Sequence, residues 1–434
     1  MSKIFVQIAS YRDPELLPTI KDLLANAKNP ENLTFGVCNQ YGEGDPDSLL
    51  EYRRDPRFRI IDIPWKESKG LCWARHLIQK LYEDETYTLQ LDSHHRFVKD
   101  WDVELIEMLK STGAKKPIIT SYAGIYKPKD DGTYEILNDT PFKMVASKFT
   151  ESGTILFFPN DIPHYKMLKK PIKARFVSGH FFFTLGIHCK EYKYDPNLYF
   201  AGDEISLSIR SFTLGYDLFH PHKTVIFHEY TREGRTKHWS DFSTENKVSG
   251  VVDNAWYEMD TASKIRLRHM LQEEDNGIDL GIYGLGNVRS HHSYEIYAGI
   301  DFKTRRLHPN TLLGIDPPIN DDTPWWLEQP EANVQVTQQE NMENIEEKPE
   351  ENKQEILENQ KEYNYDLTLI EPKDYKFVYI GVEDEAGNLL YREDLKFVPN
   401  ILKLNFKSDK VPFKWIYWIV KENGEWGTRI DTKF

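Results

Sequence analysis

A carboxylate and an imidazole stand two residues apart at the end of an apolar run. Apolar and polar side chains alternate over residues 87–91, which predicts a strand, and the run stops at Asp92, with His94 two positions on. In an open α/β sheet, ligands collect beyond the carboxyl ends of the strands. If the strand stays extended, both side chains leave it on the same face. One oxygen donor and one nitrogen donor so placed suit a divalent ion such as Mn2+. We therefore predict a metal site here, in which the ion holds a nucleotide diphosphate.

Taken alone, this motif is weak evidence, because most isolated Asp-x-His triplets are structural or incidental. His95 directly follows His94, so the second imidazole could take the ligand position instead. The flanking elements therefore have to show which other polar groups reach the same place.

Strands alternate with helices over the first third of the chain. This alternation implies a largely parallel sheet with right-handed crossovers. Asp13 before Pro14 is typical of a helix start, with Pro18 as an alternative first turn. No G-x-G-x-x-G follows the first strand and the sequence has no P-loop, which disfavours a Rossmann dehydrogenase and a P-loop ATPase. The predicted strands cover residues 3–9, 33–39, 58–63, 87–91 and 117–122, and the predicted helices cover 14–24, 69–82 and 101–109.

Two carboxylates, Asp203 and Glu204, stand at the predicted N-terminal end of a later helix. Before them, residues 176–185 predict a dense apolar strand, in which Gly179 removes a side chain and permits close approach of a ligand. Residues 124–171 have an irregular pattern. The carboxylates are therefore a second set of polar groups that the sheet could bring to the metal.

A third histidine, His228, ends the short apolar run 225–227. The polar residues 229–242 that follow have no apolar periodicity, so we predict a mobile loop there, before a helix over 254–271. A histidine at a strand end can equally be a structural residue with both ring nitrogens satisfied.

Composition limits the class of protein. The net charge of the 434 residues is -14 and basic residues form no local cluster, which argues against a nucleic-acid partner. The three cysteines are far apart and predict a reducing compartment rather than a disulfide framework or a zinc knuckle. The sequence shows no signal peptide and no apolar span of about 18 residues, so we predict a cytoplasmic protein without membrane insertion.

Three domains are predicted from shifts in composition. Residues 1–315 form the α/β domain, and 316–362 form a linker that is rich in Glu, Asn and Gln and cannot bury a core. Residues 363–434 predict a small all-β module with several strands and a turn at 385–388. Its tryptophans are expected in the core more than in a binding surface, although the module could bind a carbohydrate or a partner, or mediate oligomerisation.

Five short motifs, taken together and in order, resemble the polypeptide α-N-acetylglucosaminyltransferases, a family that includes cytoplasmic enzymes modifying hydroxyproline. The metal motif is also similar to that of the mucin-type polypeptide GalNAc-transferases, where a Gly-Leu-x-x-Ala-Arg helix precedes it. The resemblance covers about residues 1–315 and does not extend to the β module. The motifs are SYRDP at 10–14, GLCWARH at 70–76, LDSH at 91–94, AGDE at 201–204 and YGLG at 283–286.

The resemblance implies an α/β fold of the GT-A type, a Rossmann-like nucleotide-diphospho-sugar transferase domain. It also implies UDP-GlcNAc as donor, Mn2+ or Mg2+ as cofactor, retention of anomeric configuration and a protein or peptide acceptor. Carried over residue by residue, Asp92, His94 and His228 would hold the metal, and the ion would offset charge on the departing diphosphate.

The resemblance also assigns the other candidate residues. Tyr11 would lie near the base, Asp203 and Glu204 would bond sugar hydroxyls, and Arg75 would reach the diphosphate or the sugar. The competing structural roles are helix capping for the carboxylates and surface or ion-pair roles for the arginines. The implied catalytic residues are Asp203, Glu204 and Arg75, and the implied donor-binding residues are Ser10, Tyr11, Arg12, Arg75, Ser93, Arg232 and His238.

Several alternatives stay open at this point. A metal-dependent hydrolase or nucleotidyltransferase could use the same ligands, and a carbohydrate-binding protein could carry a degenerate transferase domain. The acceptor oxygen could belong to serine, threonine, hydroxyproline or a glycan. Retention could follow from a covalent carboxylate intermediate or from a front-face route in which the departing phosphate takes the acceptor proton.

Overall fold

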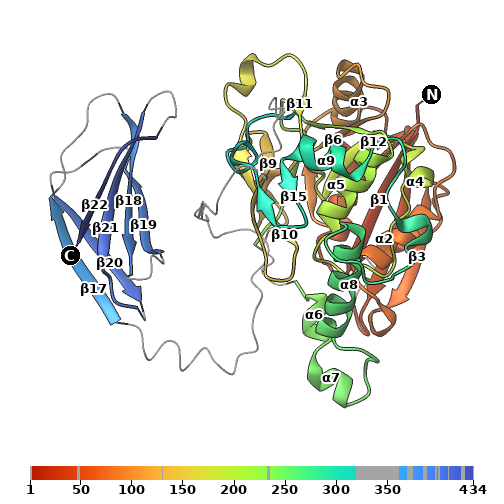
Figure 1. The fold of residues 1–434 in the computed structure, drawn as a ribbon. Helices are drawn as coiled ribbons and strands as arrows, with labels where there is room; N and C mark the ends of the chain where they lie inside the picture. Colours follow the sequence, from red (N-terminus) through yellow and green to blue (C-terminus); the bar gives the residue numbers. More distant parts are fainter. Residues whose placement is uncertain are drawn as a thin grey trace. The chain divides into compact units, whose positions relative to one another are not determined.

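The computed structural model divides into two compact units, Met1–Glu343 and Asn344–Phe434, both drawn in Figure 1. Most of the predicted acidic linker lies outside the described residues. The residues that the structure describes are 2–45, 49–129, 131–231, 235–318, 361–368, 375–384, 389–395, 398, 401–408, 410–421 and 426–433.

An eight-stranded sheet forms the centre of the first unit. In spatial order its strands are β11 (Ile172–Lys173), β13 (Asp217–His220), β6 (Pro117–Thr120), β12 (Phe181–Leu185), β4 (Tyr87–Asp92), β1 (Ile4–Tyr11), β2 (Leu33–Tyr41) and β3 (Phe58–Pro64). Strands β4, β1, β2 and β3 are parallel neighbours, and β6 is parallel to β13. Only β12, between β4 and β6, and the edge strand β11 are antiparallel. The prediction of a largely parallel sheet is therefore confirmed.

Helices cover the sheet, and β1 shows how the sequence alternation builds the layers. Ile4, Val6 and Ile8 pack in one apolar cluster with residues of α1 and α3, whereas Phe5 and Ala9 pack with residues of α2. Successive side chains of a strand point to opposite faces, so one run of residues fills two layers. The helices are α1 (Leu16–Asn26), α2 (Leu71–Gln79), α3 (Trp101–Ser111), α4 (His188–Glu191), α5 (Asp203–Thr213), α6 (His238–Asp241), α7 (Thr244–Val248), α8 (Trp256–Met270), α9 (His291–Ala298) and α10 (Pro309–Leu312).

The sequence pattern suggested that residues 124–171 are irregular, but the structure shows strands there. They contain four strands, of which β7 and β8 join a second sheet in the order β5-β14-β7-β8, while β9 pairs with β10. Strand β8 is almost wholly exposed and β9 is buried on both faces, so neither shows the apolar alternation that marks a half-buried strand. These strands are β5 (His95–Phe97), β7 (Gly124–Pro128), β8 (Tyr134–Asn138), β9 (Phe142–Phe149), β10 (Ile155–Asp161) and β14 (Ile226–His228), and a short pair is β15 (Ile300–Asp301) with β16 (Arg306–Leu307).

The dense apolar run 176–185 is a strand only over its second half. In its first half the backbone amides donate to side chains instead of to a neighbouring strand: Val177 donates to Ser208 Oγ at 2.7 Å, and Ser178 donates to Thr120 Oγ1 at 2.9 Å. Burial alone therefore explains the apolar residues there, and strand pairing begins only with β12.

Two predicted boundaries also move. Helix α1 begins at Leu16, because Asp13 turns the chain first by accepting the Glu15 amide at 2.9 Å. The predicted loop 229–242 contains the short helix α6. Both differences place polar side chains near the end of β4.

The second unit is rich in strands, as predicted. A four-stranded sheet, in the order β19-β18-β21-β22, accompanies the pair β17–β20. Val378, Ile380 and Tyr417 are buried in its core, and Trp415 packs against that core, which gives this tryptophan a structural role. The strands are β17 (Lys361–Thr368), β18 (Tyr375–Glu383), β19 (Leu389–Leu395), β20 (Ile401–Ser408), β21 (Lys414–Lys421) and β22 (Trp426–Lys433). Among the described residues, no helix combines the length and apolarity needed to cross a bilayer.

Candidate metal and donor site

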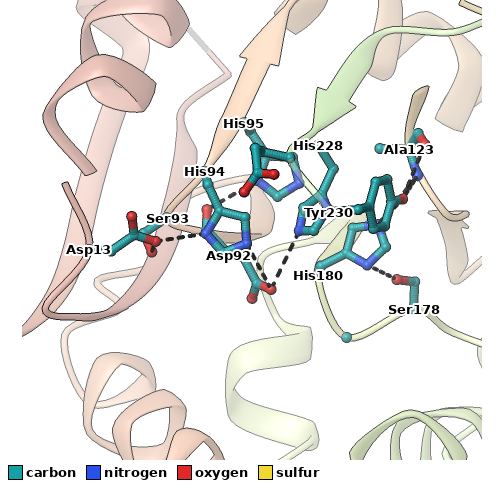
Figure 2. A network of polar contacts seen from close by, with 12 residues as sticks. Asp13, Asp92, Ser93, His94, His95, Ala123, Ser178, His180, His228 and Tyr230 are labelled. Atoms are coloured by element: carbon teal, nitrogen blue, oxygen red, sulfur yellow. Dashed lines mark hydrogen bonds and ion pairs between the residues drawn. The ribbon is translucent and has the colours of Figure 1, made fainter. Parts of the chain in front are cut away.

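The structure brings Asp92, His94 and His228 together. Asp92 ends β4, His94 lies in the turn before β5, and His228 ends β14. Strand β14 pairs antiparallel with β5, so a histidine from far along the chain lies beside this turn. One ligand atom from each residue lies within 4.8 Å of the others, and Figure 2 shows the three side chains converging.

The spacing of these side chains fits a metal ion better than direct hydrogen bonds. Asp92 Oδ2 lies 3.9 Å from His94 Nε2 and 3.8 Å from His228 Nε2. Two donors that each lie about 2.1 Å from one ion are separated by roughly 3 to 4 Å. His228 Nε2 is buried, and no residue that the structure describes forms a hydrogen bond with it. An ion would satisfy this nitrogen, so the three residues fit a divalent cation.

Asp13, which the sequence analysis treated only as part of a helix start, orients His94. Its Oδ2 lies 2.7 Å from His94 Nδ1 and accepts from Ser93 Oγ at 2.7 Å (Figure 2). Burial opposes ionisation of Asp13, but His94, Arg235 and Ser93 together hold its pKa below the usual value. An ionised carboxylate can only accept, so His94 Nδ1 donates to Asp13, and Nε2, on the side of Asp92, is the nitrogen left for a cation.

Two neighbouring histidines lie outside the ligand group. His95 Nδ1 lies 3.1 Å from the carbonyl oxygen of Asp92, which can only accept, so this nitrogen donates. His180 Nε2 accepts from the Ala123 amide at 3.3 Å. Their rings pack behind His228 at centroid distances of 4.8 and 4.4 Å. The group that converges therefore contains His94 and not His95.

Arg75 is buried beneath the site. One guanidinium nitrogen donates to Asp92 Oδ1 at 2.8 Å and the other is paired with Asp203, and its side chain is only 2% exposed. Burial acts to raise the pKa of Asp92, but His228, Arg75 and His94 hold it well below the usual value. Burial raises the pKa of Asp203 despite Arg75. The structure thus places Arg75 between two carboxylates, where it orders Asp92.

Glu204, at the start of α5, is held by protein donors. It accepts from the Gly179 amide at 3.0 Å and from Tyr122 Oη at 3.0 Å. The sequence suggested that Gly179 leaves room for a ligand, but protein side chains occupy that space. A Cβ atom there would lie 2.9 Å from Asp203 Oδ2 and 3.2 Å from Arg75, so the glycine admits the protein's own side chains.

A cavity of about 140 Å3 opens beside Asp92 and His94. The predicted donor-binding residues Tyr11 and His238 line it with Asp92 and His94, whereas Ser10 and Ser93 are buried and Ser93 is bonded to Asp13. The first residues of α2 also face it, and a helix N-terminus favours anions. The lining residues are Ala9, Tyr11, Asp13, Gln40, Gly70, Leu71, Asp92, His94, Tyr199, Phe200, Arg235, Thr236, Lys237, His238 and Trp239.

The segment around α6 packs onto the end of β1. Asp241 accepts from Tyr11 Oη at 2.8 Å and from Arg12 at 3.0 Å. His238 contacts Tyr199 Oη at 2.7 Å and Ser68 Oγ at 2.9 Å, and burial lowers its pKa to about 3. The predicted donor residue Arg232 lies outside the described residues. The other loop residues therefore form one wall of the cavity.

Comparison with known proteins identifies the class. Residues 3–56 and 48–304 match the family model described as Glycosyltransferase (GlcNAc). The match covers more than half of the chain, so the chain belongs to this family and is a glycosyltransferase. No curated protein matches the sequence. The predicted α/β fold class with a strand-rich C-terminal unit is confirmed, and the hydrolase, nucleotidyltransferase and degenerate binding-protein alternatives are disfavoured.

Solved structures with low sequence identity are also similar. The structure of GalNAc-T7 with UDP, GalNAc and Mn2+ has a TM-score of 0.45 and 16% identity, over 68% of this chain and 54% of that one. S. aureus TarS 1-349 has a TM-score of 0.35 and 12% identity, over 63% and 74%. TarS 1-349 in complex with UDP-GlcNAc has the same score and identity, over 62% and 72%. This chain spans about half the length of the GalNAc-T7 chain.

Proposed function

We propose that this glycosyltransferase has a GT-A fold and transfers GlcNAc from UDP-GlcNAc to a serine, threonine or hydroxyproline hydroxyl of a protein, with Mn2+ or Mg2+ as cofactor. The observation that carries the proposal is the convergence of Asp92, His94 and His228, of which Asp92 and His94 line a cavity. The family description, which names GlcNAc, supports the sugar.

The proposed roles of the residues follow from their contacts. An ion held by Asp92, His94 and His228 would offset the charge of the diphosphate. Arg75 keeps Asp92 ionised and in place, and the start of α2 favours the phosphates. Tyr11 and His238 form the far wall, where the nucleoside would lie. A cavity of about 140 Å3 is small for a nucleotide sugar, so the α6 segment would have to shift to admit it.

We propose a front-face route for retention. The acceptor oxygen bonds to the sugar C1 as the bond from C1 to the phosphate oxygen breaks on the same face, and the acceptor proton passes to that phosphate oxygen. The buried Asp203, paired with Arg75, and Glu204, held by Gly179 and Tyr122, support a positioning role for both carboxylates. No side chain then has to act as nucleophile.

Two other features stay proposals. The cysteines Cys38, Cys72 and Cys189 are free and buried, which supports a reducing, cytoplasmic location. Residues 363–434, joined by an acidic linker at 316–362, would bind the acceptor or mediate oligomerisation.

The test is a donor screen. The purified chain is incubated with UDP-GlcNAc, UDP-GalNAc, UDP-glucose or UDP-galactose, with Mn2+ or with EDTA, and released UDP is measured. Manganese-dependent hydrolysis of UDP-GlcNAc is expected, with His94→Ala as the inactive control. Release from another donor alone would change the sugar. No release and no thermal shift with any donor would contradict the proposal.

A further inference from the structure

The Asp13 carboxylate lies where three segments of the first unit meet. Asp13 follows β1. Its Oδ2 accepts from Ser93 Oγ at 2.7 Å and from Arg235 at 3.5 Å, and lies 2.7 Å from His94 Nδ1. Its side chain is only 5% exposed. The steps of the proposed transfer do not involve this carboxylate, yet it contacts a proposed metal ligand directly.

We propose that Asp13 is a positioning residue for the metal, which acts by fixing the tautomer and the ring plane of His94. This inference rests on the proposed metal site. A neutral imidazole can carry its proton on either nitrogen, and only the other nitrogen can bind a cation. Asp13 accepts from Nδ1, so Nε2, on the side of Asp92, is the nitrogen left for a cation. Such outer carboxylates also raise the basicity of the ligand.

Asp13 is itself fixed before any ion binds. Its Oδ1 accepts the Glu15 amide at 2.9 Å, and its Oδ2 accepts the Ser93 hydroxyl. Because the two oxygens are anchored by different segments, the carboxylate cannot rotate away from His94 without breaking other hydrogen bonds. The geometry at His94 is therefore preorganised by the protein.

The other histidine ligand is held differently. His228 has no hydrogen-bonded carboxylate on Nδ1 among the described residues. Its ring packs instead against His180, His95 and Tyr230, at centroid distances of 4.4, 4.8 and 4.2 Å. Packing fixes the ring of His228, whereas His94 depends on Asp13. Loss of Asp13 should therefore act on metal binding through one ligand only.

The experiment is calorimetric titration of the full chain with Mn2+, without donor. Asp13→Ala is expected to weaken Mn2+ binding about 10- to 100-fold. Asp13→Asn, which keeps the volume of the side chain and one acceptor, is expected to lose less, and it carries the test if Asp13→Ala does not fold. The absorption spectrum of Co2+ bound in place of Mn2+ should change in both variants.

Asp102→Asn is the matched control. Asp102 is a carboxylate on α3 that is buried like Asp13 and accepts the Lys28 amide at 2.7 Å and the Asn29 amide at 3.0 Å. This variant is expected to lower the melting temperature while Mn2+ affinity stays unchanged. A purely structural Asp13 would behave in the same way as Asp102.

The two levels of the proposal fail in different ways. Wild-type Mn2+ affinity in Asp13→Ala, together with loss of binding in His94→Ala, would overturn the role of Asp13 and leave the metal site standing. Absence of Mn2+ binding by the wild-type chain, or full binding by His94→Ala, would overturn the metal site itself, and the role of Asp13 with it.

Discussion

Two groups of buried histidines differ in what surrounds them. His94 and His228 face the carboxylate of Asp92 at distances too long for hydrogen bonds. His220, buried at the end of β13, has both ring nitrogens satisfied by backbone groups, at 2.8 and 3.3 Å, and His188 contacts a serine hydroxyl at 3.1 Å. A buried imidazole is therefore suited to bind a cation where one nitrogen is left facing a carboxylate, and is structural where backbone and hydroxyl partners occupy it.

The largest effect should come from the residue that keeps Asp92 in place. Arg75→Met would leave the buried Asp203 and the half-buried Asp92 without their cation, and the free energy of unfolding should fall by about 3–5 kcal/mol. Urea denaturation measures it. Arg53→Met, which breaks a more exposed pair with Asp62, should cost less than about 1 kcal/mol. Equal losses in the two variants would show that burial of the Arg75 pair adds nothing.

Substitutions in the two groups of histidines should affect Mn2+ affinity differently. His94→Ala and His228→Ala should each weaken Mn2+ binding by at least about 100-fold, because one of three donors is lost. His188→Gln should leave Mn2+ affinity unchanged while it lowers the melting temperature. Calorimetric titration with Mn2+ separates the two groups. A change in Mn2+ affinity in His188→Gln would remove the distinction.

His188 and His220, the structural histidines, should make the free energy of unfolding depend on pH when no metal is present. Burial lowers the pKa of His188 to about 3 and that of His220 to about 4. The unfolded chain binds protons on these groups below about pH 6.5 and the folded chain does not, so stability falls as the pH decreases from there toward the folded-state values. Between pH 7 and pH 5 each should remove about 2 kcal/mol. Urea midpoints at several pH values would record it, and His188→Gln should flatten the slope.

The smallest effect should come from removing the second unit. All residues of the proposed site belong to the first unit, so a chain ending at residue 318 should hydrolyse UDP-GlcNAc as fast as the full chain and melt at a similar temperature. Released UDP and thermal unfolding are the measurements. Loss of the fold on truncation would place the domain boundary elsewhere.

The sequence brought Asp92, His94 and His228 forward as a group because the signals were local. Asp92 and His94 follow an apolar run and His228 ends another, so strand ends alone bring them forward. Asp13 could not be found in this way. Its contact with His94 arises because β1 and β4 are neighbours, with Ala9 opposite Asp92. The order of strands in a sheet is a property of the tertiary structure and cannot be seen in a local sequence pattern.

The sequence does not show which protein groups surround Arg75 and Gly179. Arg75 lies between Asp92 and Asp203, and Gly179 admits the Asp203 carboxylate, while contact of Arg75 with the donor stays a prediction. In the sequence, a basic residue on the helix before β4 gives no sign that it will lie between two carboxylates. The strand content of 124–171 was missed for a similar reason, since a fully exposed or doubly buried strand lacks alternation.

The pairing of β14 with β5 has a consequence during synthesis of the protein. Asp92 and His94 are synthesised well before His228. His228 lies beside them only after β14 has paired with β5. A half-made chain offers two donors and would hold an ion poorly. If the proposed site holds an ion, the ion would bind only the completed arrangement and would therefore stabilise finished molecules over unfinished ones.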